Sequence, residues 1–147
     1  MIEKISEYTI DEIYIGQKTK FNVVITGNMI KEFARLSGDH NPLHTDENYS
    51  ATTKFGKIIC PGMFLAGFFS RLVGMNIPGK NSLYFSQSLK FISPCFINDE
   101  IIVIGEVISK SLTTKIITLK TIIQNTHGKE LVKGEAKVLV REWNVKK

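Results

Sequence analysis

The hydrophobic pattern divides the chain into a helical first half and a strand-rich second half. In the first half, apolar residues recur at intervals of three and four, a spacing that places their side chains on one face of a helix. The first such run consists of Met29, Ile30, Phe33, Ala34 and Leu36. A threonine that can cap a helix precedes this run and a glycine that can end one follows it, so a helix is predicted between Thr26 and Gly38. A short strand is predicted just before it, over residues 20–25.

Two further helices are predicted before the pattern changes. Asp46 can cap a short helix that stops near Gly56. Pro61 precedes an apolar run, and proline is common in the first turn of a helix, so the third helix is predicted from Pro61 to about Gly74. Its continuous apolar character is typical of a helix that is buried in the core.

From Ser82 onward the pattern is that of strands. Four segments rich in isoleucine, valine, leucine and aromatic residues follow one another, with turn residues between them: 82–92, 99–109, 114–125 and 129–143. The sequence "NTHG" at 125–128 is suited to a hairpin turn between the last two. Consecutive strands with short links predict an antiparallel sheet, and the third helix is hydrophobic enough to cover one face of it. The predicted fold class is α+β, an antiparallel sheet wrapped around one central helix.

Length and composition favour a single domain over residues 1–147, because 147 residues with 43% hydrophobic content suffice for one core. The nearly uncharged run 58–69 is shorter than the about 18 apolar residues of a membrane span, so we expect no membrane insertion. Acidic residues near the N-terminus argue against a signal peptide. Two cysteines, Cys60 and Cys95, do not make a disulfide framework. We therefore expect a cytoplasmic protein.

The net charge of +5 raises the question of an anionic partner. The lysines are scattered and form no basic run of the kind that follows a phosphate backbone, so we expect no nucleic-acid binding. A positive surplus also favours an anionic small ligand, because it raises the local concentration of that ligand.

Polar residues with chemical potential gather in one short segment, "LSGDHNPLH" at 36–44. Asp39 and His44 stand five positions apart in a stretch that Pro42 stiffens, between a helix end and the start of the predicted buried helix. A loop that places an acid and a histidine against apolar surface is a setting for acid–base chemistry. Aspartate, asparagine, glycine and proline are also ordinary turn formers, so these residue types alone fit a plain loop as well.

The same segment resembles a family signature. "GDHNPLH", Gly38–His44, is similar to the Gly-Asp-x-Asn-Pro-aliphatic-His motif of the MaoC-like (R)-specific enoyl-CoA hydratases, and Ser50 matches the small residue six places beyond the histidine. The resemblance continues through 56–74, 77–100 and 133–138, and so covers nearly the whole chain. It implies a hot-dog fold, in which an antiparallel sheet wraps a long central helix. It also implies a homodimer with sheets edge to edge and sites near the subunit boundary.

The resemblance implies a reaction and assigns residues to it. The reaction is the reversible syn addition of water to a trans-2-enoyl-CoA, giving an (R)-3-hydroxyacyl-CoA, with no metal or redox cofactor, coenzyme A being part of the acyl-CoA substrate. Asp39 and His44 would hold the water, and which of them is the base stays open. Asn41 would shape the loop or orient a catalytic partner. The Gly62 amide, at the start of the central helix, would donate to the thioester oxygen.

Other assignments stay open at the level of sequence. Ser70 and Val73 resemble positions that line the acyl pocket of related hydratases, although core packing explains them equally well. The substrate carrier could be an acyl carrier protein, which would make the protein a 3-hydroxyacyl-[acyl carrier protein] dehydratase. A non-catalytic acyl-CoA-binding protein and a hot-dog thioesterase are further alternatives, because one fold hosts several functions. Chain-length preference, metabolic direction and the residues that bind the CoA phosphates are not assigned.

Overall fold

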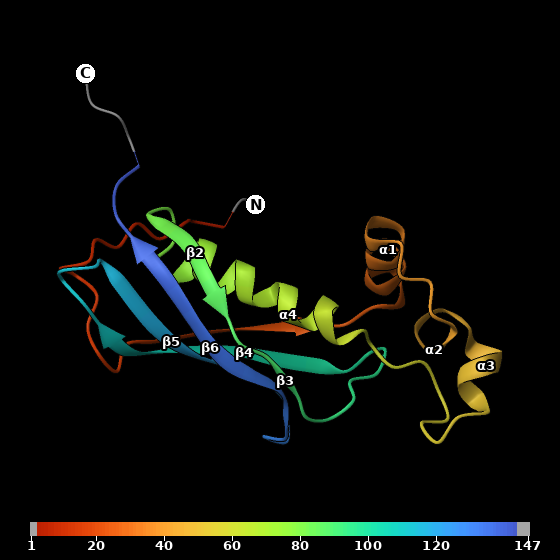
Figure 1. The fold of residues 1–147 in the computed structure, drawn as a ribbon. Coiled ribbons are helices and arrows are strands. Elements are labelled where there is room, and N and C mark those ends of the chain that lie inside the picture. The colour runs from red at the N-terminus through yellow and green to blue at the C-terminus, as the bar shows by residue number, and fades with distance from the viewer. Residues whose placement is uncertain (1–2, 144–147) are drawn as a thin grey trace.

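One antiparallel sheet with a helix lying across its face forms the body of the molecule (Figure 1). The computed structural model describes residues 3–143. The strands follow one another across the sheet in the order β1 (Lys18–Val24), β4 (Glu100–Lys110), β5 (Ile116–Asn125), β6 (Glu130–Val140) and β2 (Ser82–Gln87). The short β3 (Lys90–Phe91) also pairs with β6, and every pairing is antiparallel. The predicted antiparallel sheet is therefore confirmed.

The helix across the sheet is α4 (Gly62–Arg71), which continues as a π-helical turn, η1 (Leu72–Asn76). Its Leu65 and Phe69 side chains are buried in a cluster with strand residues such as Val103 and Ile123. Each large apolar side chain that is fully buried in this way contributes roughly 1.5–3 kcal/mol. The α+β prediction is confirmed.

The two ends of this helix each show one further detail, at Pro61 and opposite Gly105. Pro61 has an extended backbone, with ψ of 133°, and so caps α4 rather than forming its first turn. Gly105 on β4 faces Leu72, and a Cβ atom there would lie 2.7 Å from the leucine Cδ2 atom. Glycine at this position lets the end of the helix approach the sheet closely.

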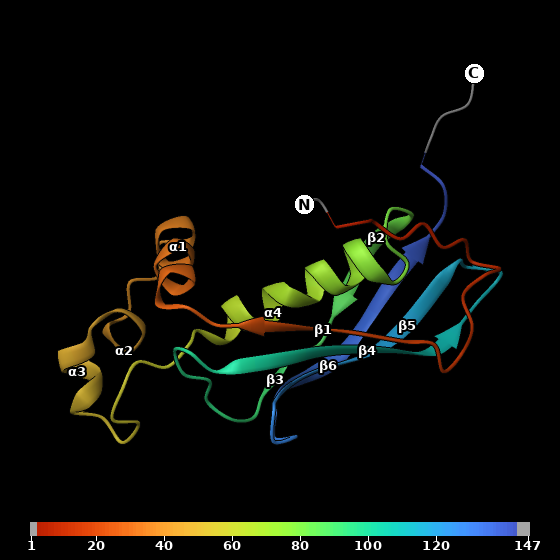
Figure 2. The same ribbon diagram turned by 180° about the vertical axis from the view of Figure 1, so that it is seen from behind.

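Three helices lie to one side of the sheet, beyond the first turn of α4 (Figures 1 and 2). They are α1 (Gly27–Ser37), α2 (Pro42–Thr45) and α3 (Glu47–Ala51). The Thr26 hydroxyl accepts the Met29 N–H at 3.2 Å and starts α1, and Gly38, with φ of 80°, ends it. The predicted helix that becomes α1 is confirmed. α3 begins after Asp46 as predicted but ends at Ala51 rather than near Gly56, and α2 was not predicted. Within residues 3–143, no helix is both long enough and apolar enough to cross a membrane.

The predicted strand 82–92 is two strands in the structure. β2 and β3 are separated by Ser88 and Leu89, and the Ser88 hydroxyl accepts the Glu135 N–H at 2.9 Å. A side-chain oxygen thus replaces a backbone carbonyl in the ladder with β6, and this substitution interrupts the strand. The predicted turn at Asn125–Gly128 is confirmed between β5 and β6, where Asn125 Oδ1 accepts the His127 and Lys129 N–H groups.

Candidate functional site

His44 lies on α2, the short helix that the Gly38–His44 motif builds. Asn41 caps this helix through Oδ1, which accepts the Leu43 N–H at 3.0 Å, and Pro42 occupies its first position. His44 Nδ1 lies 2.7 Å from the Ile59 carbonyl oxygen. Because a carbonyl can only accept a hydrogen bond, Nδ1 must carry a proton. In a neutral ring, Nε2 then has the free lone pair, so the fold selects the tautomer in which Nε2 can act as a base.

Asp39 directly follows the left-handed Gly38 and lies in the same loop. Its Oδ1 accepts the Asn41 N–H at 3.2 Å, and the residue is exposed in the single chain. The two contacts of Asn41, one through its backbone and one through its side chain, link Asp39 to the helix that carries His44. Asn41 therefore shapes the loop that holds both residues.

Ser50 attaches α3 to this loop. It is fully buried, and its hydroxyl lies 3.3 Å from the Pro42 carbonyl oxygen and 3.0 Å from that of Leu43. These carbonyl groups belong to α2. The Pro42 carbonyl also accepts the Asp46 N–H at 2.9 Å and the Leu43 carbonyl the Ile59 N–H at 3.4 Å, so the Ser50 hydroxyl adds a further hydrogen bond to this part of α2. The small residue of the motif thus stabilises the helix on which His44 stands.

Gly62 is the first residue of α4, so its N–H has no acceptor within its own helix. The positive end of the helix dipole lies at this amide and favours a developing negative charge. A Cβ atom at Gly62 would lie 2.6 Å from Cδ1 of Phe91, which is closer than real Cβ contacts. A side chain at this position would therefore force the Phe91 ring or the start of α4 to move.

A cavity of about 550 Å³ brings His44 and Gly62 together. Asp39 is not among the residues that line it. Most of the wall is apolar, and the lining side chains come from the loop after α3, the first turn of α4, the segment 91–95 and β6. The lining residues are His44, Lys54, Phe55, Ile59, Cys60, Gly62, Met63, Leu65, Phe91, Ile92, Ser93, Pro94, Cys95, Leu131 and Val132.

Ser70 and Val73 do not line this cavity. Ser70 lies on the exposed face of α4, and Val73 is buried in a second apolar cluster with Leu119 and Val138. Their assignment to the acyl pocket stays a prediction.

Two cysteines face each other in the cavity wall. The Cys60 N–H donates to the Cys95 carbonyl oxygen at 2.8 Å, and both residues are buried. A hydrogen bond between the two thiols, together with burial, raises the pKa of Cys60 above its ordinary value. The Cys60 thiol therefore stays protonated at neutral pH and adds no charge to the cavity.

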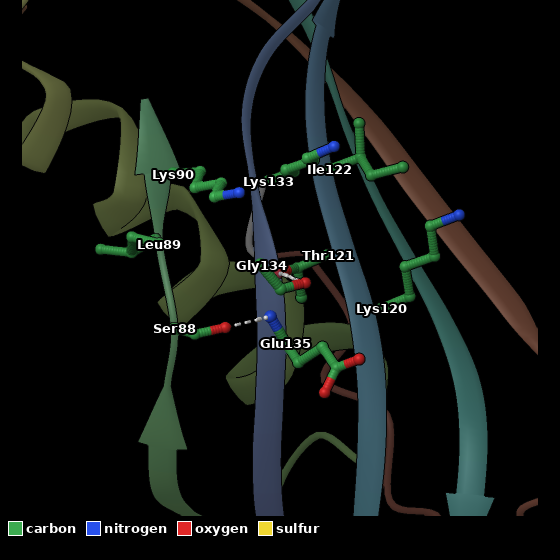
Figure 3. A pocket seen from close by; sticks show the side chains of 9 residues that line it. All are labelled: Ser88, Leu89, Lys90, Lys120, Thr121, Ile122, Lys133, Gly134 and Glu135. Carbon is green, nitrogen blue, oxygen red and sulfur yellow. Dashed lines mark hydrogen bonds between the residues drawn. The ribbon is translucent and has the colours of Figure 1, made fainter. Parts of the chain in front are cut away.

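A second cavity, of about 400 Å³, lies on the sheet between β5, β6 and the segment 88–90 (Figure 3). Three lysines and Glu135 contribute side chains to it, and the Thr121 hydroxyl donates to the Gly134 carbonyl oxygen at 3.0 Å. It contains no histidine or cysteine and no unpaired amide of a helix start. The first cavity, which holds His44 and Gly62, is therefore the better candidate for chemistry.

Several residues of the site could not be recognised from the sequence. The Ile59 carbonyl is a backbone group 15 positions from His44, and nothing in its residue type predicts that it orients the ring. Phe91 and Lys54 lie in segments with ordinary composition. They reach the cavity only because the chain folds back on itself there.

Comparison with known proteins gives consistent matches over the whole fold. A family model described as a MaoC like domain matches residues 12–133. The (R)-specific enoyl-CoA hydratase of Aeromonas caviae is 42% identical over 124 residues, which are 84% of this chain and 92% of that protein. The protein of the same name from Rhodospirillum rubrum is 37% identical over 130 residues, which are 88% of this chain and 90% of that protein. The unliganded R-hydratase of Pseudomonas aeruginosa superposes with a TM-score of 0.89 at 30% identity, covering 97% of this chain and 94% of that one.

Proposed function

Because this chain belongs to the MaoC-like domain family, we propose that it is an (R)-specific enoyl-CoA hydratase. The enzyme would add water across the double bond of a trans-2-enoyl-CoA to give an (R)-3-hydroxyacyl-CoA, and would catalyse the reverse dehydration. The observation that carries the proposal is the orientation of His44 by Ile59 in a cavity that also contains the Gly62 amide. One base and one oxyanion donor are the groups that hydration of a conjugated thioester requires.

His44 is the base in this proposal. Its Nε2 takes a proton from water while the water oxygen forms a bond to the β-carbon. The imidazolium then returns that proton to the α-carbon from the same face, so that hydrogen and hydroxyl add in the syn sense. The contact between Nδ1 and the Ile59 carbonyl, at 2.7 Å, keeps the ring in one orientation through both transfers.

Asp39 orients the water. Its carboxylate accepts one hydrogen bond from the Asn41 N–H and retains acceptor positions for a hydrogen of the water. A water held by both Asp39 and His44 has its oxygen lone pair directed away from them, towards the substrate. Asn41 acts through these two residues because it caps α2 and donates to Asp39.

The Gly62 amide stabilises the intermediate. Attack at the β-carbon moves negative charge to the thioester oxygen, and an N–H at a helix start is placed to donate to that oxygen. Loss of one such donor costs on the order of 100-fold or more in rate in other acyl enzymes.

The proposed reaction requires no metal and no redox cofactor. Hydration leaves the overall oxidation state of the substrate unchanged, and side chains and a backbone amide supply each proton and charge contact. Coenzyme A enters as part of the substrate. Activity that survives exhaustive treatment with a chelator would agree with this proposal, and activity lost and then restored by a divalent metal would contradict it.

We also propose that the protein is a cytoplasmic homodimer. The two buried cysteines are free, which supports a reducing compartment. The edge strand β2 carries Leu83 and Phe85, which are 53% and 69% exposed in the single chain. An edge strand with exposed apolar side chains is suited to pairing with the same strand of a second copy.

The first experiment mixes the purified protein with crotonyl-CoA and follows loss of the conjugated enoyl-thioester absorbance, with chiral analysis of the product. We expect rapid formation of the (R)-3-hydroxy product. Asp39→Asn and His44→Ala should each lower kcat/KM by about 100-fold or more while the circular dichroism spectrum stays unchanged.

Other outcomes would contradict the proposed residue roles or favour a different function. A fully active, folded Asp39→Asn protein would contradict the roles given above. Release of free CoA, detected with a thiol reagent, would favour a thioesterase. Turnover of crotonyl-carrier protein without turnover of crotonyl-CoA would favour an acyl carrier protein dehydratase, the name that two more distant relatives, from tomato and Arabidopsis thaliana, carry.

A further inference from the structure

We infer that Lys54 binds the phosphates of coenzyme A at the rim of the cavity that contains His44 and Gly62. The inference rests on the proposed function and adds a recognition residue to it. Lys54 lies in the loop after α3 and lines this cavity, and the residue as a whole is exposed. A lysine that lines a cavity while its charge stays in solvent is suited to bind the part of a ligand that protrudes from the cavity.

The charges around the cavity favour an anion at this place. Among its 15 lining residues, Lys54 is the one lysine or arginine, and none is an aspartate or glutamate. The rest of the wall is mainly apolar or uncharged, which suits an acyl chain and a pantetheine arm. No carboxylate of the lining residues competes with a phosphate for the Lys54 ammonium.

Lys54 is also free to bind. Four ion pairs occur within residues 3–143, and none of them includes Lys54. Its Nζ lies 5.3 Å from the centroid of the Phe55 ring, and Phe55 lines the same cavity. This cation–π contact holds the ammonium near the cavity without neutralising its charge.

The chemistry of the substrate supplies the matching group. A CoA thioester is neutral at the reacting acyl end and strongly anionic at the nucleotide end. Binding of the acyl end among His44, Gly62 and apolar side chains leaves the phosphates outside, where a lysine acts as a point charge that donates to them. The same charge attracts the anionic substrate during encounter, an effect that salt weakens.

Two other lysines, Lys57 and Lys133, fit this role less well. Lys57 is three positions along the same loop but lines a different cavity with Glu47, and its Nζ lies 4.4 Å above the Phe96 ring. Lys133, in the sheet cavity of Figure 3, already pairs with Glu130 at 3.8 Å. Lys57 therefore provides a matched control for Lys54.

The test compares Lys54→Met, Lys54→Arg and Lys57→Met with the unmodified protein on two substrates. Crotonyl-CoA carries the phosphates, whereas crotonyl-pantetheine has the same thioester and arm without them. We expect Lys54→Met to raise KM for crotonyl-CoA about threefold to fivefold at low salt, the effect of losing a solvent-exposed ion pair. We expect kcat, and all constants for crotonyl-pantetheine, to stay unchanged. Lys54→Arg should restore KM, and Lys57→Met should not change it.

Calorimetric titration with free CoA separates this inference from the proposed function. Weaker CoA binding by Lys54→Met than by Lys57→Met would support the phosphate contact even if neither thioester is hydrated, a result that would overturn only the hydratase proposal. An equal loss of kcat/KM on both substrates would mean that Lys54 shapes the cavity and would overturn the inference. Equal effects of Lys54→Met and Lys57→Met, or no effect of Lys54→Met on KM and CoA binding, would also overturn it.

Discussion

At the scale of single residues, the site depends on backbone groups as much as on side chains. The Ile59 carbonyl selects the His44 tautomer, and the Gly62 amide is the proposed oxyanion donor. The sequence pointed to Asp39 and His44, the side chains proposed to carry chemistry, because acids and histidines are recognisable by type. It could not predict the Ile59 contact, because every residue has a carbonyl and only the fold determines which one meets the ring.

Gly62 gives a prediction that separates packing from chemistry. Alanine there would place Cβ 2.6 Å from Cδ1 of Phe91, so the ring or the helix start must move. We expect Gly62→Ala to lower kcat/KM for crotonyl-CoA by about 10-fold or more, because misplacement of the N–H weakens oxyanion stabilisation. We also expect it to lower the free energy of unfolding by about 1–3 kcal/mol through overpacking.

The control is Gly62→Ala combined with Phe91→Ala, measured by steady-state kinetics and urea unfolding. Removal of the ring relieves the clash, so the double variant should recover part of the activity that Gly62→Ala loses. If the double variant loses as much activity and stability as Gly62→Ala and Phe91→Ala lose together, Phe91 is not the group that an alanine at position 62 displaces.

At the scale of elements, the sequence predicted those with strong periodicity and missed those that side chains create locally. The run that became α1 and the apolar stretch that became α4 were both predicted, because their hydrophobic spacing spans several turns. The four-residue α2 was missed, because it is too short for periodicity and depends on the Asn41 cap. The break at Ser88 was missed, because it arises from one hydroxyl that bonds Glu135 on a distant strand.

A partly buried chain of polar groups links β2, β5 and β6 and gives a prediction at this scale. The Tyr84 hydroxyl donates to Gln87 Oε1, Gln87 Nε2 donates to the Thr121 hydroxyl at 3.0 Å, and that hydroxyl donates to the Gly134 carbonyl. Tyr84→Phe removes the first donor and leaves Gln87 Oε1 without this partner. We expect it to lower the free energy of unfolding by about 1 kcal/mol at neutral pH.

Tyr84 also makes the free energy of unfolding depend on pH in the alkaline range. Burial raises the pKa of Tyr84 to about 12, whereas an unfolded tyrosine titrates near its ordinary value of about 10. Its contribution is therefore complete below about pH 10 and is lost as the pH rises from about 10 to 12. Urea midpoints measured at pH 9 and pH 11 should fall less in Tyr84→Phe than in the unmodified protein. An equal fall in both would show that other groups cause the alkaline decline.

At the scale of the whole molecule, exposed apolar residues on β2 mark the surface where a second copy is proposed to bind. Sequence periodicity predicted the strands of the sheet, but it could not show that β2 lies at an edge, because its partner β6 is about 50 positions away along the chain. Leu83 and Phe85 alternate along β2 with Tyr84, which packs on the core, and therefore face solvent on the other side of the sheet.

Phe85→Lys tests this arrangement, because a charge in place of an aromatic side chain blocks an edge from pairing with its own copy. We expect the unmodified protein to elute as a dimer in gel filtration with light scattering, and Phe85→Lys to elute as a monomer with strongly reduced hydratase activity. Leu112→Lys is the matched control, because Leu112 is also exposed, at 55%, but lies in the turn between β4 and β5. A Phe85→Lys protein that stays dimeric and active would place the subunit contact away from β2. A monomer that keeps full activity would mean that one chain contains the complete site, so that the exposure of Asp39 persists in the active enzyme.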